Sequence, residues 1–338
     1  MSERGGVVGR VAGSGRPAPP LVAVLGASGF VGSAVVRRLL GEDVRLRLVS
    51  RGGVDAPAGV EVRALDLTAP GAVASAVAGA DVVLPLVLFN GADGWRVAEG
   101  EGASAAERVN VGIVRAVVDA CGDGQVVVFP GSTSQVGPRA GERVDGSEPD
   151  FPDTPYDRQK QAAERVVLGA AGVRGISLRL PTVFGPGPKD RGVVSAMARR
   201  ALAGEPLTVW GEGSALRDLV FVDDVADAFA AAVAHADRLA GRHWLLGSGR
   251  GVRVAAPFAA AAEAVARRTG APAAPVVSVP VPAHATEMDL RGLVADPGAF
   301  HAVTGWRARV GWVDGLARTV EALTVGHPYF PSGEPLSF

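Results

Sequence analysis

A glycine-rich stretch between an apolar run and a helical run constrains the fold of this chain most strongly. Leu21 to Leu25 is continuously apolar, glycines follow at positions 26, 29 and 32, and Ser33 to Leu40 has the composition of a helix. In the order strand, turn, helix, such glycines permit a tight turn and bring the backbone close to a pyrophosphate at the helix N-terminus. The residues predicted to bind a dinucleotide here are Gly26, Ser28, Gly29, Phe30, Val31 and Gly32.

Strands and helices alternate along the first half of the chain. The expected strands are 44–49, 60–65, 81–89, 126–129 and 176–180, and the expected helices are 72–77, a run opening at Asn110, and 155–168. Such alternation indicates a parallel sheet covered on both faces. We therefore predict an α/β fold with a Rossmann-type doubly wound sheet in residues 21–180. Residues 181–338 are expected to form mainly a smaller C-terminal substrate-binding lobe, interleaved with the main sheet, and residues 1–20 a disordered tail.

The residues after the second and third strands bear on the choice of cofactor. About 18 residues beyond Gly32, where a carboxylate would bind the ribose of NAD, the chain has Ser50 and Arg51. A guanidinium and a hydroxyl suit a 2′-phosphate, which favours NADPH. The alternative is that Arg51 is a solvated loop residue. Asp66 and Leu67 follow the third strand, in a position suited to an adenine edge.

Tyr156 and Lys160 form the pair most indicative of catalysis. The chain has two tyrosines and two lysines, and one of each lies four residues apart in a run without internal Gly or Pro. On a helix these side chains share a face, so the ammonium would lower the pKa of the phenol from about 10 toward working pH. The pair therefore predicts a general acid or base. The alternative is an exposed helix on which both residues merely cover surface.

Hydroxyl-bearing residues follow the buried strand at 126–129. Side chains at the carboxyl ends of such strands face the crevice where ligands bind, so Ser132 is expected to hydrogen-bond a substrate carbonyl beside Tyr156. The alternative is an ordinary turn serine. The long Gly-rich stretch at 90–104, which carries Trp95 and Arg96, is predicted to be a loop that borders the substrate.

Composition excludes several classes of function. A net charge of −1 with interspersed acids and bases gives no basic face for nucleic acid. No apolar run approaches the roughly 18 residues of a membrane helix. The single cysteine, Cys121, excludes an internal disulfide framework and suits a reducing cytoplasm. The five histidines lack metal-ligand spacing, so no metal site is predicted.

The chain resembles the extended short-chain dehydrogenase/reductase family over residues 21–325. The resemblance rests on the glycine stretch GASGFVG, the Asn-Val-Gly at Asn110, Ser132, the Tyr156 and Lys160 pair, LRLPTVFGPG from Leu178, RDLVFVDDVADAF from Arg217, GWRARV from Gly305 and DGLARTVE from Asp314.

The resemblance implies a role for each matching residue. Tyr156 would exchange a proton with the substrate oxygen, Ser132 would hydrogen-bond that oxygen, and Lys160 would hold the nicotinamide ribose and depress the Tyr pKa. Asn110 would anchor a water in the proton relay. The remaining implied contacts are Pro181 and Val183 to the nicotinamide, and Thr133, Thr182 and Arg217 to the substrate, with Arg217 gripping the pyrophosphate of a nucleotide sugar.

Two departures from the family pattern affect the diphosphate site. Thr182 stands where many relatives have Asn, and Thr286 stands where many have Arg. Other groups must therefore contact a diphosphate, with Arg191 and Arg291 as candidates.

The resemblance also separates reaction types. Dehydratases of the family carry Asp-Glu after the catalytic hydroxyl, whereas this chain has Thr133 and Ser134, which disfavours elimination. Epimerases usually retain NAD through an acid after the second strand, whereas Arg51 favours a phosphate-bearing cofactor that is consumed in net reduction.

Four stretches resemble bacterial dTDP-4-keto-6-deoxyhexose 4-ketoreductases of antibiotic deoxysugar pathways, namely GSTSQVGPRAGERVDGSEPD, TPYDRQKQAAE, RGVVSAMARRALAGEPLTVWGEG and LAGRHWLLGSGRG. This implies NADPH-dependent reduction of the 4-keto group of a dTDP-activated sugar by a cytoplasmic homodimer paired through the helices that carry Asn110 and Tyr156. The alternatives are an NAD-dependent nucleotide-sugar 4-epimerase and a non-catalytic NADP-sensing protein.

Overall fold

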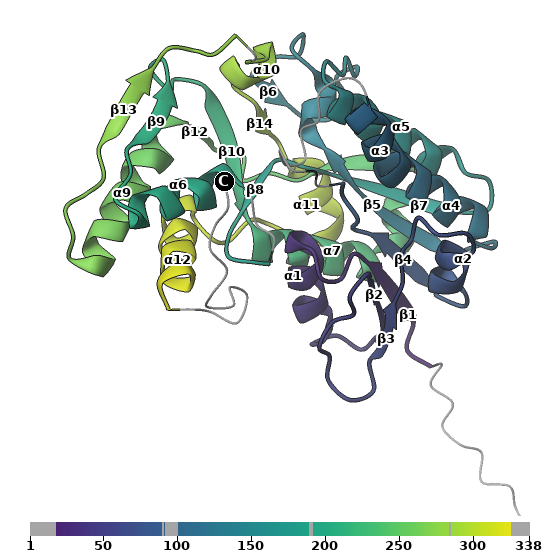
Figure 1. Cartoon of the computed structure of the whole chain (residues 1–338). Coiled ribbons are helices and arrows are strands. Elements are labelled where there is room, and N and C mark those ends of the chain that lie inside the picture. The colour runs from purple at the N-terminus through teal and green to yellow at the C-terminus, as the bar shows by residue number, and fades with distance from the viewer. Residues whose placement is uncertain (1–17, 90, 92–100, 189–191, 284, 326–338) are drawn as a thin grey trace, which may run out of the picture.

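A seven-stranded parallel sheet organises the larger of two lobes (Figure 1). The computed structural model describes residues 18–89, 91, 101–188, 192–283 and 285–325. The sheet order is β11-β7-β5-β4-β1-β2-β3, so the chain moves outward from β1 to β3 and then returns to place β4 beside β1. The strands are β1 (Leu21–Leu25), β2 (Arg45–Ser50), β3 (Glu61–Ala64), β4 (Val82–Pro85), β5 (Val126–Ser132), β7 (Arg174–Leu180) and β11 (Arg242–Leu245). The prediction of a Rossmann-type fold is confirmed, and the reversal of strand order marks where such sheets bind ligands.

Helices bury both faces of this sheet. Along β1, Val22 and Val24 join one apolar core, whereas Leu21, Ala23 and Leu25 join the other. This period of two, with apolar residues on both sides, is expected of a parallel strand covered on both faces. The first face carries α1 (Phe30–Leu39), α7 (Val222–Ala234), α8 (Ala236–Leu239) and α11 (Gly298–Thr304); the second carries α2 (Ala72–Val77), α4 (Ile113–Ala120) and α5 (Pro155–Gly169).

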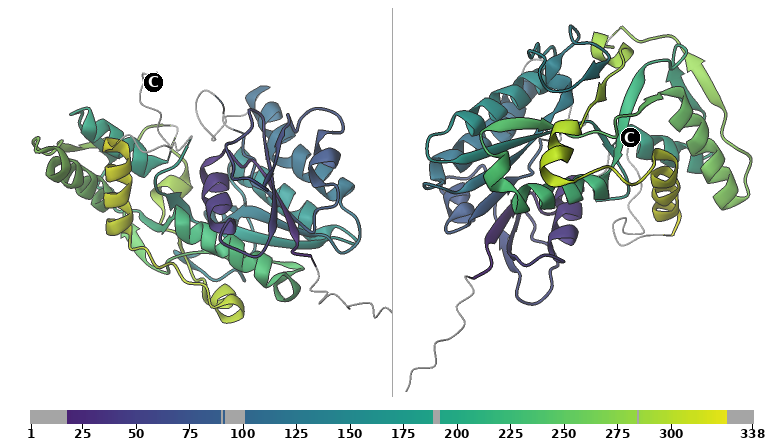
Figure 2. Two further views of the ribbon diagram at one scale, coloured as in Figure 1. Left: turned by 90° about the horizontal axis from the view of Figure 1, so that it is seen from below. Right: turned by 180° about the vertical axis from the view of Figure 1, so that it is seen from behind.

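The smaller lobe is built from short sheets and three longer helices, and lies beside the carboxyl ends of the main strands (Figures 1 and 2). Its own core includes an edge-to-face pair, Phe184 and Phe221, whose ring centroids are 5.7 Å apart. The elements are β8 (Thr182–Phe184), β10 (Leu216–Phe221) and β12 (Gly251–Arg253) in one sheet, β9 (Leu207–Trp210) with β13 (Val276–Val279) in another, and α6 (Val193–Leu202), α9 (Ala255–Thr269) and α12 (Trp312–Thr324).

The chain passes between the lobes several times after residue 180. Strand β11 and helices α7, α8 and α11 return to the main sheet. A short parallel pair, β6 (Arg143–Val144) with β14 (Val294–Ala295), joins distant parts of the sequence beside α10 (Glu287–Leu290).

Some boundaries differ from those expected. Helix α1 begins at Phe30 rather than Ser33, because the glycine turn is completed by Gly29. The helix expected from Asn110 begins at α3 (Glu101–Glu107) and runs through a π-helical turn (Arg108–Gly112) into α4. The loop prediction for residues 90–104 is therefore wrong for 101–104, which belong to α3, a helix whose three alanines at 103, 105 and 106 favour helix. Residues 90 and 92–100, and residues 1–17 of the expected tail, lie outside the described residues.

Within the described ranges, no helix combines the length and apolar character needed to cross a membrane.

Candidate active site

The glycine turn between β1 and α1 is shaped to admit a ligand at the helix N-terminus. Gly26 has φ +86°, and its N–H donates to the Val49 carbonyl at 2.8 Å. A Cβ at Gly32 would lie 2.1 Å from the Gly26 carbonyl oxygen, so only glycine permits this approach. The N-cap residue, Gly29, caps no helix N–H with a side chain, and the first turn carries no acid. A pyrophosphate fits this cradle on both steric and electrostatic grounds.

The residues expected at the adenosine end surround the end of β2. Ser50 is buried, and its hydroxyl donates to the Gly53 carbonyl at 2.8 Å. That proton is therefore engaged within the turn. Arg51 is exposed and close enough to Asp66 to contribute to lowering its carboxyl pKa, after hydrogen bonds from Thr68. Of the two residues expected to meet a 2′-phosphate, Arg51 is exposed at the surface and Ser50 supports the turn.

Helix α5 presents the expected pair on one face. Thr154 is the N-cap, accepting from the Asp157 N–H at 3.1 Å, and Pro155 occupies the first turn. The Lys160 Nζ lies 5.7 Å from the centroid of the Tyr156 ring. The predicted side-by-side arrangement of phenol and ammonium is therefore present in the structure.

Lys160 is a buried cation. Its Nζ donates to the Pro130 carbonyl at 2.8 Å and lies 5.1 Å from the centroid of the Phe129 ring. Burial lowers the pKa of Lys160 to about 8, because the charged form loses its hydration. The hydrogen bond to Pro130 also fixes α5 against β5, two residues before Ser132.

Asn110 is tied to the same helix. Its Oδ1 accepts from the Phe89 N–H at 2.8 Å, and its Nδ2 donates to Gln159 Oε1 at 2.8 Å. A π-helical turn holds it there, a feature that recurs at functional sites. Gln159 directly precedes Lys160 on α5. Its hydrogen bond with Asn110 therefore ties Asn110 to the helix that carries Tyr156 and Lys160.

Ser132 ends β5 and enters a hydrogen-bonded chain. Its Oγ lies 2.7 Å from Ser134 Oγ and accepts from the Ser134 N–H at 3.3 Å. The Ser134 hydroxyl donates to Asp157 Oδ1 on α5. The segment after Ser132 lacks carboxylates in the sequence, yet the fold supplies one from the residue next to Tyr156.

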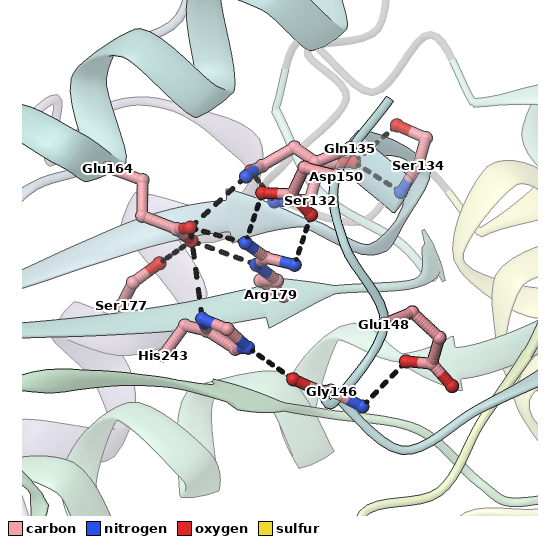
Figure 3. Close-up of polar contacts among 10 residues, drawn as sticks. All are labelled: Ser132, Ser134, Gln135, Gly146, Glu148, Asp150, Glu164, Ser177, Arg179 and His243. Carbon is pink, nitrogen blue, oxygen red and sulfur yellow. Dashed lines mark hydrogen bonds and ion pairs between the residues drawn. The ribbon is translucent and has the colours of Figure 1, made fainter. Parts of the chain in front are cut away.

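A buried polar network, shown in Figure 3, contacts the backbone N–H of Ser132 through Gln135. Gln135 Oε1 accepts from the Ser132 N–H at 2.9 Å, and Gln135 Nε2 donates to Glu164 Oε1 at 3.3 Å. Glu164 also accepts from Arg179 and from the Ser177 hydroxyl, and Arg179 donates to both Asp150 oxygens. Burial opposes the charge on Arg179, but its two carboxylate partners outweigh this and raise its pKa above the usual value.

The expected substrate and nicotinamide contacts lie where β7 passes into the smaller lobe. Ser132 pairs with Leu180 across the sheet, and the Thr133 hydroxyl donates to the Leu180 carbonyl at 3.3 Å. Pro181 follows at once, and Thr182 and Val183 pair with β10. Pro181, Thr182 and Val183 are partly exposed, and they directly follow Leu180, the residue that pairs with Ser132 across the main sheet.

Arg217 grips backbone at the end of α10. Its guanidinium donates to the carbonyls of Asp289 at 2.6 Å and Arg291 at 2.6 Å, with longer contacts to Met288 and Leu216. Thr286 caps the other end of α10, in a capping box with Asp289. The guanidinium thus anchors the α10 segment. Arg191, the other candidate for a diphosphate, lies outside the described residues.

Four site residues were not identified from the sequence: Ser134, Gln135, Asp157 and Glu164. Asp157 had a local signal, since Thr154-Pro-Tyr-Asp157 matches a capping box. That signal explains the bond from the Thr154 hydroxyl to Asp157 Oδ2 at 2.7 Å, but not the bond from Ser134. The others depend on contacts between elements distant in sequence.

A cavity of about 420 Å³ lies away from this chemistry. It is lined by Asp81, Val82, Gln125 and Val126, among others, at the amino ends of β4 and β5. Ser132 lies at the other, carboxyl end of β5. Among the described residues, no group of three or more His, Cys, Asp or Glu is arranged to hold a metal.

Curated proteins similar to this chain act on nucleotide sugars. A UDP-glucose 4-epimerase of Mycolicibacterium smegmatis is 34% identical over 142 residues, which is 41% of this chain and 42% of that protein. A dTDP-glucose 4,6-dehydratase of Xanthomonas campestris pv. campestris is 31% identical over 102 residues, 29% of each protein. The matched segments thus span less than half the length of these relatives.

Solved structures match over most of the chain. MoeE5 in complex with UDP-glucuronic acid and NAD is 28% identical, with a TM-score of 0.75 over 89% of this chain and 98% of that chain. The UDP-glucose 4-epimerase of Thermus thermophilus in complex with NAD is 27% identical, with a TM-score of 0.70 over 89% and 98%. A family model, "NAD dependent epimerase/dehydratase family", matches residues 22–247. Because this match covers more than half of the chain and contains the glycine turn, Ser132, Tyr156 and Lys160, the chain belongs to the NAD dependent epimerase/dehydratase family.

Proposed function

We propose that this protein is an NADPH-dependent reductase of the 4-keto group of a dTDP-4-keto-6-deoxyhexose. The observation that carries the choice of net reduction is Arg51. It stands exposed at the end of β2, where a carboxylate would select the ribose hydroxyl of NAD, and it presents a guanidinium to a 2′-phosphate. NADPH is consumed and exchanged at each turnover.

The chain's own residues divide the work around the substrate oxygen. Bound NADPH would supply a hydride to carbon 4. Tyr156 donates the proton to the oxygen, and Ser132 hydrogen-bonds the same atom. Lys160, held by Pro130, keeps a positive charge beside the phenol, and Asn110 braces α5 through Gln159.

The diphosphate of the sugar nucleotide is assigned to Arg217, the cation that the sequence predicts for this role. In the structure, carbonyls at the end of α10 are among the acceptors of its guanidinium.

A second candidate is an NAD-dependent nucleotide-sugar 4-epimerase. The similarity to UDP-glucose 4-epimerases, including a structure with NAD, favours it. Such an enzyme would show no net consumption of NADPH. A non-catalytic NADP-sensing protein would have no need of the Tyr156 and Lys160 pair, which is intact here.

The deciding test supplies purified protein with enzymatically prepared dTDP-4-keto-6-deoxyhexose and with NADPH or NADH in parallel. We expect oxidation of NADPH in preference to NADH. Exchange of hydrogen at carbon 4 of a dTDP-hexose without oxidation of either cofactor would assign the epimerase instead. Tyr156→Phe is expected to bind NADPH normally and to lose turnover. Tyr329→Phe, the same change at the chain's other tyrosine, is the matched control.

A further inference from the structure

Asp157 closes a hydrogen-bonded chain that starts at Ser132. The two serine Oγ atoms are 2.7 Å apart, and the Ser134 hydroxyl donates to Asp157 Oδ1. Asp157 is 3% exposed and Ser134 is partly buried. Ser132 retains 8% of its surface at the carboxyl end of β5, where a substrate oxygen would meet it.

The number of protons in this chain is limited. An ionised carboxylate can only accept, so the single hydroxyl proton of Ser134 occupies the link to Asp157. The link between the serines must then hold the single hydroxyl proton of Ser132. In this state Ser132 has no proton left for a substrate and offers it only a lone pair, which suits a substrate hydroxyl that donates.

A proton on Asp157 reverses the direction of every link. The carboxylic acid donates to Ser134, Ser134 donates to Ser132, and the Ser132 proton becomes available to a substrate oxygen. A ketone oxygen can only accept, and this second arrangement supplies it with the Ser132 proton without breaking the link to Ser134. Binding of the ketone by Ser132 with every link kept therefore takes up one proton from solvent, which resides on Asp157.

We propose that Asp157 is a positioning residue which, through Ser134, selects whether Ser132 accepts from a substrate hydroxyl or donates to a substrate ketone. The proposal rests on the proposed function, because it takes the keto and hydroxy forms of one sugar as the two ligands. It assigns Asp157 no contact with the substrate. The same carboxylate caps α5 through its other oxygen, which accepts from Thr154 at 2.7 Å.

Other charged or titratable groups share this environment. Strand β5 and the short helix at Thr133–Val136, which carries Ser134, have none. Those on α5, on the other elements packed most closely against it and on the loop leading into it are Tyr156, Arg158, Lys160, Glu164, Arg165, Arg108, Arg115, Asp119, Arg174, Arg179, Asp145, Glu148, Asp150 and Asp153. The variants below keep all of them, so a difference between variants isolates Asp157.

The test compares binding of the keto and hydroxy sugars by calorimetry between pH 5.5 and 8.5. The keto sugar is paired with NADP+ and the hydroxy sugar with NADPH, so that neither mixture can react. In the parent protein, preference for the keto form should fall by about fivefold to tenfold as pH rises, the worth of one hydrogen bond. Ser134→Ala and Asp157→Asn should abolish this pH dependence, and Ser134→Thr, which keeps the hydroxyl, should restore it.

Thr154→Ala is the control for the capping role. It removes the contact to Asp157 Oδ2 and leaves the link to Ser134, so it should lower Tm by about 2 °C and retain the pH-dependent preference. A preference that pH does not change in the parent, or that survives in Ser134→Ala, refutes the positioning role while the substrate class stands. A parent protein that binds neither sugar overturns the proposed function, and the positioning role with it.

Discussion

Arg179 and Glu164 form a buried two-point ion pair beneath Ser132. Arg179 Nε lies 3.0 Å from Glu164 Oε2, and a terminal guanidinium nitrogen lies 2.5 Å from Oε1, with side chains 2% and 5% exposed. The second partner of Arg179, Asp150, is 15% exposed. Glu164 also accepts a hydrogen bond from Gln135, and Gln135 in turn accepts one from the Ser132 N–H. The position of the Ser132 backbone therefore depends on a buried ion pair.

Glu164→Gln should therefore destabilise the protein strongly. The change leaves Asp150 as the one carboxylate bound to Arg179 and places a neutral amide against the buried guanidinium. We expect the free energy of unfolding to fall by about 3 kcal/mol. Urea unfolding measures the loss. Glu263→Gln breaks the exposed ion pair with Arg267, whose side chains are 67% exposed, and should change the free energy of unfolding by less than about 0.5 kcal/mol. Equal effects at the two positions would show that the network beneath Ser132 contributes no more than a surface pair.

The sequence predicts the elements of this site better than their connections. The glycine spacing, the apolar strands and the four-residue interval in α5 are local patterns, so the sheet and the shared face of Tyr156 and Lys160 follow from them. Asp157 reaching Ser134 joins residues 23 apart on different elements, and no periodicity encodes it. Likewise, the polar composition of α5 leads to the expectation that Glu164 is solvated. Only the packing of α5 on β7 places it against Arg179.

The role of Arg217 illustrates a different limit. Its match to a motif predicts a phosphate partner, whereas its hydrogen bonds go to carbonyls at the end of α10. Residues 289 and 217 lie 72 positions apart, and the bond forms only because a short helix ends there. The motif predicts the functional group at a position, here a guanidinium. The packing of elements distant in sequence determines which acceptors that group binds.

Lys160 makes the stability of the cofactor-free protein depend on pH. Burial lowers its pKa from 10.5 to about 8, so between these values the unfolded chain binds more protons and the free energy of unfolding rises with pH. Below about pH 8 the buried charge costs about 3 kcal/mol, at 1.36 kcal/mol per pKa unit. Lys160→Met should remove the rise. Urea unfolding of parent and variant from pH 7 to 10 measures the difference. If the free energy of unfolding changed with pH in the same way in both proteins, burial of a charged Lys160 would not be the cause of the rise.

Arg51 should determine cofactor preference. Arg51→Ala removes the guanidinium from a 2′-phosphate, so KM for NADPH should rise about tenfold to a hundredfold, as for a lost hydrogen bond to a charged group, while KM for NADH stays unchanged. Arg45→Ala, at the exposed opposite end of the same strand, should change neither value. An unchanged KM for NADPH in Arg51→Ala would leave Arg51 as a solvated loop residue and favour the epimerase.

Gly32 should tolerate no side chain. A Cβ there would lie 2.1 Å from the Gly26 carbonyl oxygen, which is rigid backbone, so Gly32→Ala must displace α1 from the turn. We expect a loss of about 1–3 kcal/mol of stability, as for an overpacked site, and at least a tenfold weaker affinity for dinucleotide. Gly52→Ala is the control, because a Cβ there meets nothing within 4 Å and needs no unusual φ. It should be neutral or slightly stabilising, since alanine restricts the unfolded chain. Fluorescence titration with NADPH and urea unfolding measure both effects. If Gly32→Ala bound the cofactor as tightly as Gly52→Ala does, the pyrophosphate could not lie at the α1 N-terminus, because the displaced helix would no longer present its N–H groups there.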